Sequence, residues 1–383
     1  MLLGIQEFLK MMNRKINFAD YDSVLVMNDI EHLFLAGGVT GFVPQKISSI
    51  TPWEMFISSY ENTHGSKELI DVYREAELEY AMISNKNILP INGGTSGLYA
   101  ALSEAICNRG KKILVFTPCW SMYDKIITHL GGECIFIPFQ QDDIDILIKK
   151  VENKANDMLG AILIASPMNP TGITVKNNIW KILLELSDKI NTHLIVDETY
   201  FGLEYNEKNS ILKVAKNINS ITVIRSLSKY YCMPGLRVGF IIASSDLIKK
   251  YHNIARDMYL SVSNLSQKIA SELIVKFKDL NWHKTYCLER LKRFEKLGDK
   301  YSYLKIIHPD SAFFVCFMLL DHNGNVISAQ KLSEVTGIVA RDCNDFKMNG
   351  FLRINLCCSE DIFDLFIKKM QLFLETMENK YNE

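Results

Sequence analysis

Short apolar runs alternate with longer segments of helical period over the first two thirds of the chain. Runs that are apolar throughout and rich in β-branched residues are typical of parallel strands covered on both faces. They are Ile113–Phe116, Cys134–Pro138, Ala161–Ala165, Leu194–Val196, Thr222–Ile224 and Val238–Ile242. The intervening segments of helical period are Gly97–Asn108, Ser121–Leu130, Ile179–Asp188 and Ile211–Lys216. This alternation predicts an α/β domain with a mostly parallel sheet over residues 46–245.

The pattern changes after this region. Residues 246–277 have the period of one long amphipathic helix, 312–320 form an apolar candidate strand, and 359–378 form a closing helix. We therefore expect a smaller α+β domain over residues 246–383, completed by an N-terminal segment, 1–45.

Composition and charge exclude several classes of function. The 383 residues are 48% hydrophobic and 23% charged, and 43 basic against 44 acidic side chains leave a net charge of −1. Binding to nucleic acid or to an anionic membrane needs a basic excess, so we expect neither partner. No apolar run approaches the ~20 residues that span a bilayer. Basic residues follow the apolar part of the N-terminus, the reverse of a signal peptide, so we expect a cytoplasmic protein.

The nine cysteines are scattered, and none forms a C-x-x-C pair. Reduced, buried thiols are the simplest interpretation, and they fit a cytoplasmic location. A zinc site or a catalytic thiol remains the alternative, and we expect no metal.

Polar residues follow the apolar runs, where ligands bind in α/β sheets. Lys229 lies between two apolar strands, close to Ser226, Ser228 and an arginine in R-S-L-S-K. A lysine held near other cations and away from water loses its proton more readily, as Schiff-base chemistry requires. Arg237, eight residues further on, could hold a phosphate together with the two serines.

Other candidates fit a flat, charged ring. Asp197 follows three apolar residues, and a buried carboxylate needs a cationic partner such as a protonated pyridine nitrogen. Asn169 and Tyr200 could donate to a phenolate oxygen. Trp120 could stack on the ring or simply pack in the core. The glycine-rich helix start around Gly94 is a second, weaker candidate for phosphate binding.

Six motifs in this order resemble fold-type I pyridoxal-phosphate (PLP) enzymes of the aspartate aminotransferase superfamily. The motifs are GGTSG, P-x-W-x-x-Y, N-P-T-G, D-E-x-Y, S-x-S-K-x-x-x-x-P-G-L-R-x-G and R-I-N-L. They are most similar to the class I/II branch that includes histidinol-phosphate aminotransferase and threonine-phosphate decarboxylase. The resemblance covers nearly the whole chain. It implies a large domain with a mostly parallel seven-stranded sheet, a smaller α+β domain and pyridoxal 5'-phosphate as cofactor.

The resemblance also implies roles. Lys229, Asp197 and Tyr200 would be the catalytic set: Lys229 would form the internal aldimine and shuttle a proton, and Asp197 would pair with the pyridinium nitrogen. Tyr200 and Asn169 would bond the phenolic oxygen, and Trp120 would stack on the ring. The implied phosphate ligands are Gly94, Thr95, Ser96, Ser226, Ser228, Arg237 and, from the second subunit of a homodimer, Tyr60.

Substrate residues are implied in the same way. Arg353 would take the substrate α-carboxylate bidentately, Gly38 with its segment would close over it, and Asn169 would contribute as well. Tyr123 would support Asp197. Arg341 in V-A-R-D-C is either close to the site or a solvated arginine.

Three functions remain open, two enzymatic and one non-catalytic. An arginine that holds the carboxylate favours an aminotransferase acting on an amino acid and a 2-oxoacid. Decarboxylation or β/γ-elimination with cyclisation is the alternative on the same scaffold, and a non-catalytic PLP-binding regulator is the third. The L-A-G-G-V-T-G-F-V-P segment and the tyrosine pair after Lys229 depart from the usual pattern, which suggests a specialised amino acid substrate.

Overall fold

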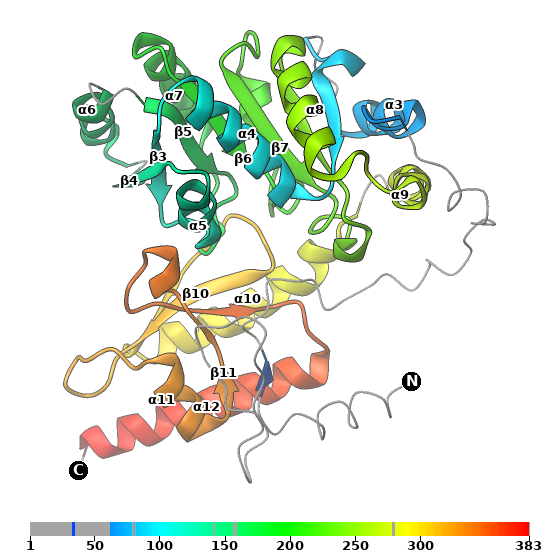
Figure 1. Ribbon diagram of the computed structural model, residues 1–383. Helices are drawn as coiled ribbons and strands as arrows, with labels where there is room; N and C mark the ends of the chain where they lie inside the picture. The colour runs from blue at the N-terminus through cyan, green and yellow to red at the C-terminus, as the bar shows by residue number, and fades with distance from the viewer. Residues whose placement is uncertain are drawn as a thin grey trace. The chain divides into compact units, whose positions relative to one another are not determined.

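The computed structural model describes residues 33–34, 62–78, 80, 82–140, 142–155, 159–277 and 280–382. These residues belong to two compact units (Figure 1). Unit 2 contains the described residues from 62 to 281 together with Asp310–Ala312. Unit 1 contains β1 (Leu33–Phe34), Trp282–Pro309 and the described residues from 313 onward.

The described part of unit 2 is built on a seven-stranded sheet with the order β2-β8-β7-β6-β5-β3-β4. Neighbouring strands from β7 to β4 run parallel, and β8 runs antiparallel to both β7 and β2. The strands are β2 (Ile88–Ile91), β3 (Lys112–Thr117), β4 (Glu133–Pro138), β5 (Leu159–Ala165), β6 (His193–Asp197), β7 (Ile221–Ser226) and β8 (Gly239–Ala243). The predicted mostly parallel sheet is confirmed. The short strand β2 was not predicted from the sequence.

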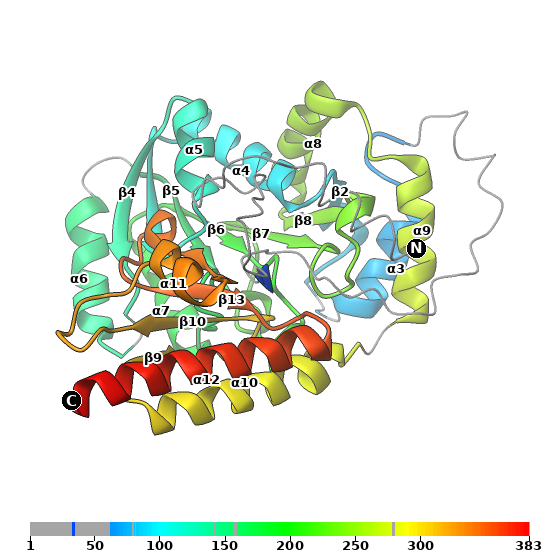
Figure 2. The ribbon, with the colours of Figure 1, turned by 90° about the horizontal axis from the view of Figure 1, so that it is seen from below.

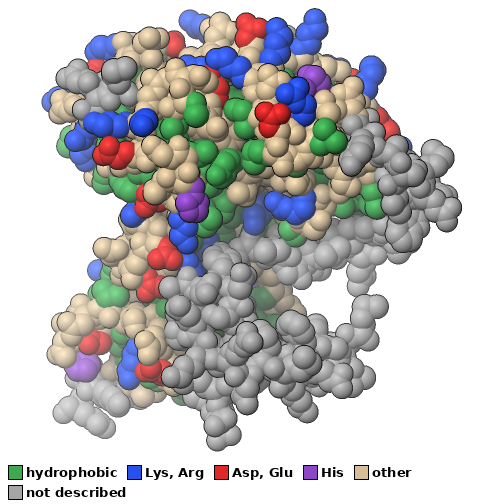
Figure 3. All heavy atoms as spheres, viewed as in Figure 1, with side chains coloured by type: hydrophobic (Ala, Val, Ile, Leu, Met, Phe, Trp, Pro, Cys, Tyr) green, Lys and Arg blue, Asp and Glu red, His purple; other side chains and the backbone are tan. Residues whose placement is uncertain are grey.

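Helices cover this sheet. The helices are α3 (Lys67–Glu77), α4 (Gly94–Asn108), α5 (Met122–His129), α6 (Ile144–Ala155), α7 (Asn177–Lys189), α8 (Ser245–Tyr259) and α9 (Asn264–Lys276). Helices α4, α5 and α8 lie on one face of the sheet (Figure 2). Their apolar side chains form one core with that face, while α7 packs against β6. On the face of the molecule drawn in Figure 3, basic and acidic side chains are interspersed, in keeping with the net charge of −1.

Two helix predictions were wrong. The single helix expected over 246–277 is broken into α8 and α9, because Leu260 has a φ of +64° and Ser263 caps the start of α9. The helix expected over 211–216 is one 3-10 turn, Ile211–Lys213. The predicted domain boundary after residue 245 falls behind the first residue of α8, and both α8 and the preceding β8 lie in unit 2. The division into domains stays a prediction.

Unit 1 combines antiparallel strands with helices. Its described residues form a four-stranded sheet of order β12-β13-β10-β9 and a parallel pair, β1 and β11. The elements are α10 (Trp282–Lys300), β9 (Leu304–Ile307), β10 (Phe314–Leu319), α11 (Ala329–Thr336), β11 (Ile338–Val339), β12 (Arg341–Asp342), β13 (Leu352–Asn355) and α12 (Glu360–Asn382). Helices α10 and α12 run side by side (Figures 1 and 2). In the part of the chain that is described, no helix has the length and hydropathy needed to cross a membrane.

Candidate active site

The predicted cofactor residues gather at one edge of the unit 2 sheet. Asp197 is the last residue of β6 and Ser226 the last of β7. Asn169 follows β5, and Gly94 begins α4, the helix that follows β2. Because β5, β6 and β7 run parallel, their carboxyl ends meet at the edge where α/β proteins bind ligands.

Asp197 is buried and accepts two hydrogen bonds. The Tyr123 hydroxyl donates to Oδ2 at 2.6 Å, and the Thr199 amide donates to Oδ1 at 2.9 Å. Burial raises the pKa of Asp197, while the bonds from Thr199 and Tyr123 and the charge of Lys229 oppose that rise. Burial, and then the Asp197 charge, hold the pKa of Tyr123 well above its usual range. Tyr123 therefore stays a protonated donor to the carboxylate.

Lys229 is half-buried, and its Nζ lies 5.7 Å from the ring centroid of Tyr200. Tyr200 and Asn169 are buried. Trp120 is half-buried and meets Tyr123 edge-on, with ring centroids 5.8 Å apart. These side chains come from four segments of unit 2 and carry an amine, a phenol, an amide and an indole.

A glycine-lined cradle opens at the start of α4. Gly93 has a φ of +79°, and a Cβ added to it would lie 2.2 Å from Nη2 of Arg237. A Cβ on Gly94 would lie 3.0 Å from Thr199 Oγ1 and 3.5 Å from Ser226 Cβ. The absence of side chains therefore lets a guanidinium and two hydroxyl-bearing residues approach a helix N-terminus, an arrangement that suits an anion.

The remaining serines and the threonine of the predicted phosphate set differ in their contacts. Ser226 Oγ donates to Ser228 Oγ at 3.0 Å, and the Ser228 amide donates back to Ser226 Oγ at 3.2 Å. Ser96 Oγ donates to the Gly93 carbonyl at 2.9 Å, within the first turn of α4. Thr95 is exposed.

Thr199 was missed by sequence reasoning. It contacts Asp197 through its amide and borders the glycine cradle with its hydroxyl. The available signal was its position two residues after Asp197, inside the D-E-T-Y motif.

Both predicted substrate arginines lie in unit 1. Arg353 in β13 is fully buried, and its guanidinium lies 4.9 Å from the Phe314 ring centroid and 5.1 Å from that of Phe346. Arg341 is its ladder neighbour in β12 and donates from Nη2 to Asp345 at 2.7 Å. Arg341 is buried, so the alternative of a solvated arginine was wrong. Tyr60 and Gly38 lie outside the described residues.

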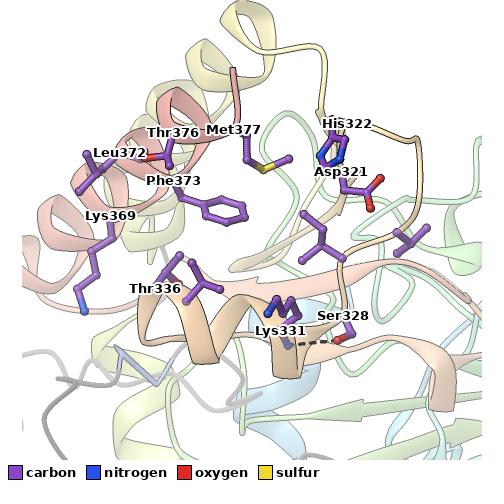
Figure 4. A pocket seen from close by; sticks show the side chains of 13 residues that line it. Asp321, His322, Ser328, Lys331, Thr336, Lys369, Leu372, Phe373, Thr376 and Met377 are labelled. Atoms are coloured by element: carbon purple, nitrogen blue, oxygen red, sulfur yellow. Dashed lines mark hydrogen bonds between the residues drawn. The ribbon is translucent and has the colours of Figure 1, made fainter. Parts of the chain in front are cut away.

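A cavity of about 790 Å³ lies elsewhere in unit 1 (Figure 4). Phe373 and Met377 of α12 point into it from one side, and Thr336 of α11 borders the other. None of the predicted site residues that the structure describes lines this cavity. None of the nine cysteines, all of them described, forms a disulfide, and no cluster of His, Cys, Asp or Glu suited to a metal occurs among the residues with described positions.

Comparisons with known proteins extend these observations. The family model of aminotransferase class I and II matches residues 57–369. An aspartate aminotransferase of Thermotoga maritima is 27% identical over 304 residues, which are 77% of each chain. A histidinol-phosphate aminotransferase of Clostridium novyi is 27% identical over 293 residues, 74% of this chain and 76% of the relative. The crystal structure of an aspartate aminotransferase from Thermotoga maritima shares the fold, with a TM-score of 0.75 and 22% identity over 97% of this chain and 96% of that one.

Proposed function

Because the chain belongs to the class I and II aminotransferase family, as its motifs predict, it is an enzyme of amino group transfer, and we propose that it uses pyridoxal 5'-phosphate to move an amino group between an amino acid and a 2-oxoacid. The observation that carries this proposal is the meeting, at one sheet edge, of a buried carboxylate, a half-buried lysine and an anion cradle. Asp197, Lys229 and Arg237 represent the three parts.

The cradle fits the phosphate group of such a cofactor. Gly93 and Gly94 leave room beside Arg237 and Ser226 that a side chain would fill. The first amides of α4 add the positive end of a helix dipole. We assign the phosphate to these residues, with Thr95, Ser96 and Ser228 as further members of the predicted set.

The Asp197 carboxylate is suited to pair with the protonated ring nitrogen of the cofactor. Its two hydrogen bonds, from Tyr123 and Thr199, fix the carboxylate and favour its charged form. A buried carboxylate of this kind is stable beside a protonated pyridine. When bound, the cofactor supplies an electron sink for the carbanion formed at the substrate Cα. The role of Asp197 is to keep the ring nitrogen protonated, which maintains that sink.

Lys229 is assigned as the covalent anchor of the cofactor and as the base that carries the proton at Cα. Its partial burial and the nearby Tyr200 limit access of water to Nζ. Tyr200 and Asn169 are assigned to the phenolic oxygen, and Trp120 to the ring face. Each of these assignments rests on the motif match and on the position of the residue at the carboxyl edge of the sheet.

Arg353 is assigned to the α-carboxylate of the substrate, with Gly38 as part of the closing segment. Phe314 and Phe346 flank its guanidinium, and such apolar surroundings strengthen a charge-assisted, bidentate bond. A carboxylate held in this way is not the leaving group, so amino transfer is favoured over decarboxylation. The named relatives are aminotransferases as well.

The assembly belongs to the same proposal. We assign a homodimer in which Tyr60 reaches the phosphate in the partner's site, and a cytoplasmic location. Size-exclusion chromatography with light scattering would measure twice the chain mass of 43.9 kDa. A monomer that retains full turnover would contradict the shared site.

Absorbance spectroscopy of the purified protein with pyridoxal 5'-phosphate tests the function. We expect a visible cofactor band that an amino donor bleaches and a 2-oxoacid restores. Lys229→Ala removes the band, and Lys213→Ala, which changes an exposed lysine of the same unit, does not. A band that returns without any oxoacid, together with released CO₂ or an eliminated group, would overturn amino transfer.

A further inference from the structure

A buried ion pair lies directly behind the candidate active site. Glu198 and Arg225 are 1% and 2% exposed, and Arg225 Nε donates to Glu198 Oε2 at 2.9 Å. Two charges removed from water in this way are costly unless the surrounding groups satisfy them.

Nearly every remaining polar atom of the pair has a partner. Ser210 Oγ and the Ile211 amide donate to Glu198 Oε1 at 2.7 and 3.1 Å. Arg225 Nη2 donates to Ser210 Oγ at 3.1 Å, and Nη1 donates to the Glu77 carbonyl at 3.2 Å. The guanidinium also lies 3.6 Å from the ring centroid of Phe201. A network satisfied to this degree holds one geometry.

Members of this network are chain neighbours of site residues. Glu198 follows Asp197, Arg225 precedes Ser226, and the stacked Phe201 follows Tyr200. Strands β6 and β7 are paired, with Asp197 opposite Ile224. Successive side chains of a strand point to opposite faces. The ion pair therefore joins the ends of β6 and β7 on the face opposite to Asp197 and Ser226.

The loop after Lys229 is attached to the same network. The Tyr231 hydroxyl donates to Glu77 Oε1 at 2.6 Å, and Glu77 also accepts from Arg225 through its carbonyl. The ring of Tyr230 packs against Gly202, where a Cβ would approach within 2.8 Å. The two tyrosines, which suggested a specialised substrate pocket, are thus both buried in contacts within unit 2.

We propose that Glu198 and Arg225 are positioning residues, which set the spacing between Asp197, Ser226 and Lys229 for the bound cofactor. The inference rests on the proposed function, because it concerns how the cofactor is held. The ion pair and its hydrogen bonds hold the ends of β6 and β7 in place. These strand ends in turn position Asp197 and Ser226 on the other face of the sheet. Such supporting contacts decide whether a site keeps its productive geometry.

The test compares Glu198→Gln with a matched control, Glu104→Gln. Glu104 is equally buried, at 1% exposed, and pairs with Lys250 and Arg109 in the same unit, but none of these three is a neighbour of a site residue. Three quantities are measured: the Kd for pyridoxal 5'-phosphate, the pH midpoint of the visible cofactor band, and Tm without cofactor. We expect Glu198→Gln to weaken cofactor binding about tenfold and to shift the midpoint, and Glu104→Gln to change Tm alone.

The outcomes are distinct. Wild-type protein without a cofactor band would overturn the proposed function itself. A wild-type band with equal Kd and midpoint in both variants would overturn only the positioning role.

If Glu198→Gln does not fold, Ser210→Ala serves instead, because it keeps both charges and removes one hydroxyl that bonds each of them. Ser210→Ala is expected to shift the midpoint in the same direction, and an unshifted midpoint counts against the proposal. Arg225→Lys, which keeps the charge, should recover part of the affinity that Arg225→Met loses.

Discussion

The pKa values of single side chains in unit 2 depend more on burial than on distant charges. Asp197 is the clearest case, because burial raises its pKa and hydrogen bonds from Thr199 and Tyr123 restrain that rise. The bond from the Tyr123 hydroxyl can be removed by one substitution that leaves the backbone unchanged. Tyr123 therefore offers direct control over the protonation of Asp197.

Tyr123→Phe is expected to move the acid limb of the kcat/KM profile to higher pH. Loss of the hydroxyl removes a bond to the charged carboxylate, so the pKa of Asp197 rises further and its charge is lost at a higher pH. The plateau at higher pH should change little. Tyr251→Phe is the control, because it removes another buried hydroxyl, 2.7 Å from Thr222 and away from Asp197. Identical acid limbs in the two variants would contradict the coupling.

Glu204 makes folding stability depend on pH. Burial, with Glu198 as a further charge, raises its pKa from 4.5 to about 7, although the Asn209 and Gly202 amides bond its carboxylate. Between these two values the folded state holds a proton that the unfolded state has lost. The free energy of unfolding therefore falls as pH rises from 4.5 to about 7, by up to about 3 kcal/mol.

Glu204→Gln should remove this dependence. Urea unfolding at pH 5 and pH 8 would measure it, with the wild type losing more stability than the variant between the two. A wild type and variant that lose the same amount would show that Glu204 titrates normally.

At the scale of elements, the sequence predicted regular, apolar segments well. Most positions of the strands from β3 to β8 are apolar, and the alternation of these strands with helical segments along the chain indicated a parallel sheet. The break between α8 and α9 was not predictable from periodicity, because it depends on one left-handed residue, Leu260, inside a continuing amphipathic pattern. The sequence motifs identified the candidate site residues. The Glu198–Arg225 ion pair, in contrast, forms because β6 pairs with β7, and the spacing of residues along the chain does not reveal that pairing.

The start of α4 gives a prediction about backbone geometry. Gly93→Ala is expected to weaken cofactor binding by about tenfold or more, because its Cβ would meet Arg237 at 2.2 Å and displace a phosphate ligand. Gly131→Ala is the matched control, because Gly131 has a similar φ of +77° and nothing within 4 Å of the added Cβ. Both variants place alanine at a positive φ, so the control shows how much of the change in Kd comes from such a substitution away from Arg237. Equal Kd values would argue against the cradle.

At the scale of the whole molecule, the proposed roles divide between the two units. The described residues assigned to the cofactor all belong to unit 2, and the assigned carboxylate ligand, Arg353, belongs to unit 1. Cofactor binding and substrate binding should therefore respond to different substitutions, even though turnover needs both.

Arg353→Lys tests this separation. A lysine keeps the positive charge but lacks the planar fork that binds a carboxylate bidentately, so KM for the amino acid should rise about 10- to 100-fold. The Kd for pyridoxal 5'-phosphate should stay at the wild-type value. Arg290→Lys changes another buried arginine of unit 1, bonded to the carbonyls of Leu356 and Cys358, and should alter Tm without altering KM. If Arg353→Lys weakens cofactor binding instead, the assignment of the α-carboxylate to Arg353 is wrong, and another cation must hold the substrate.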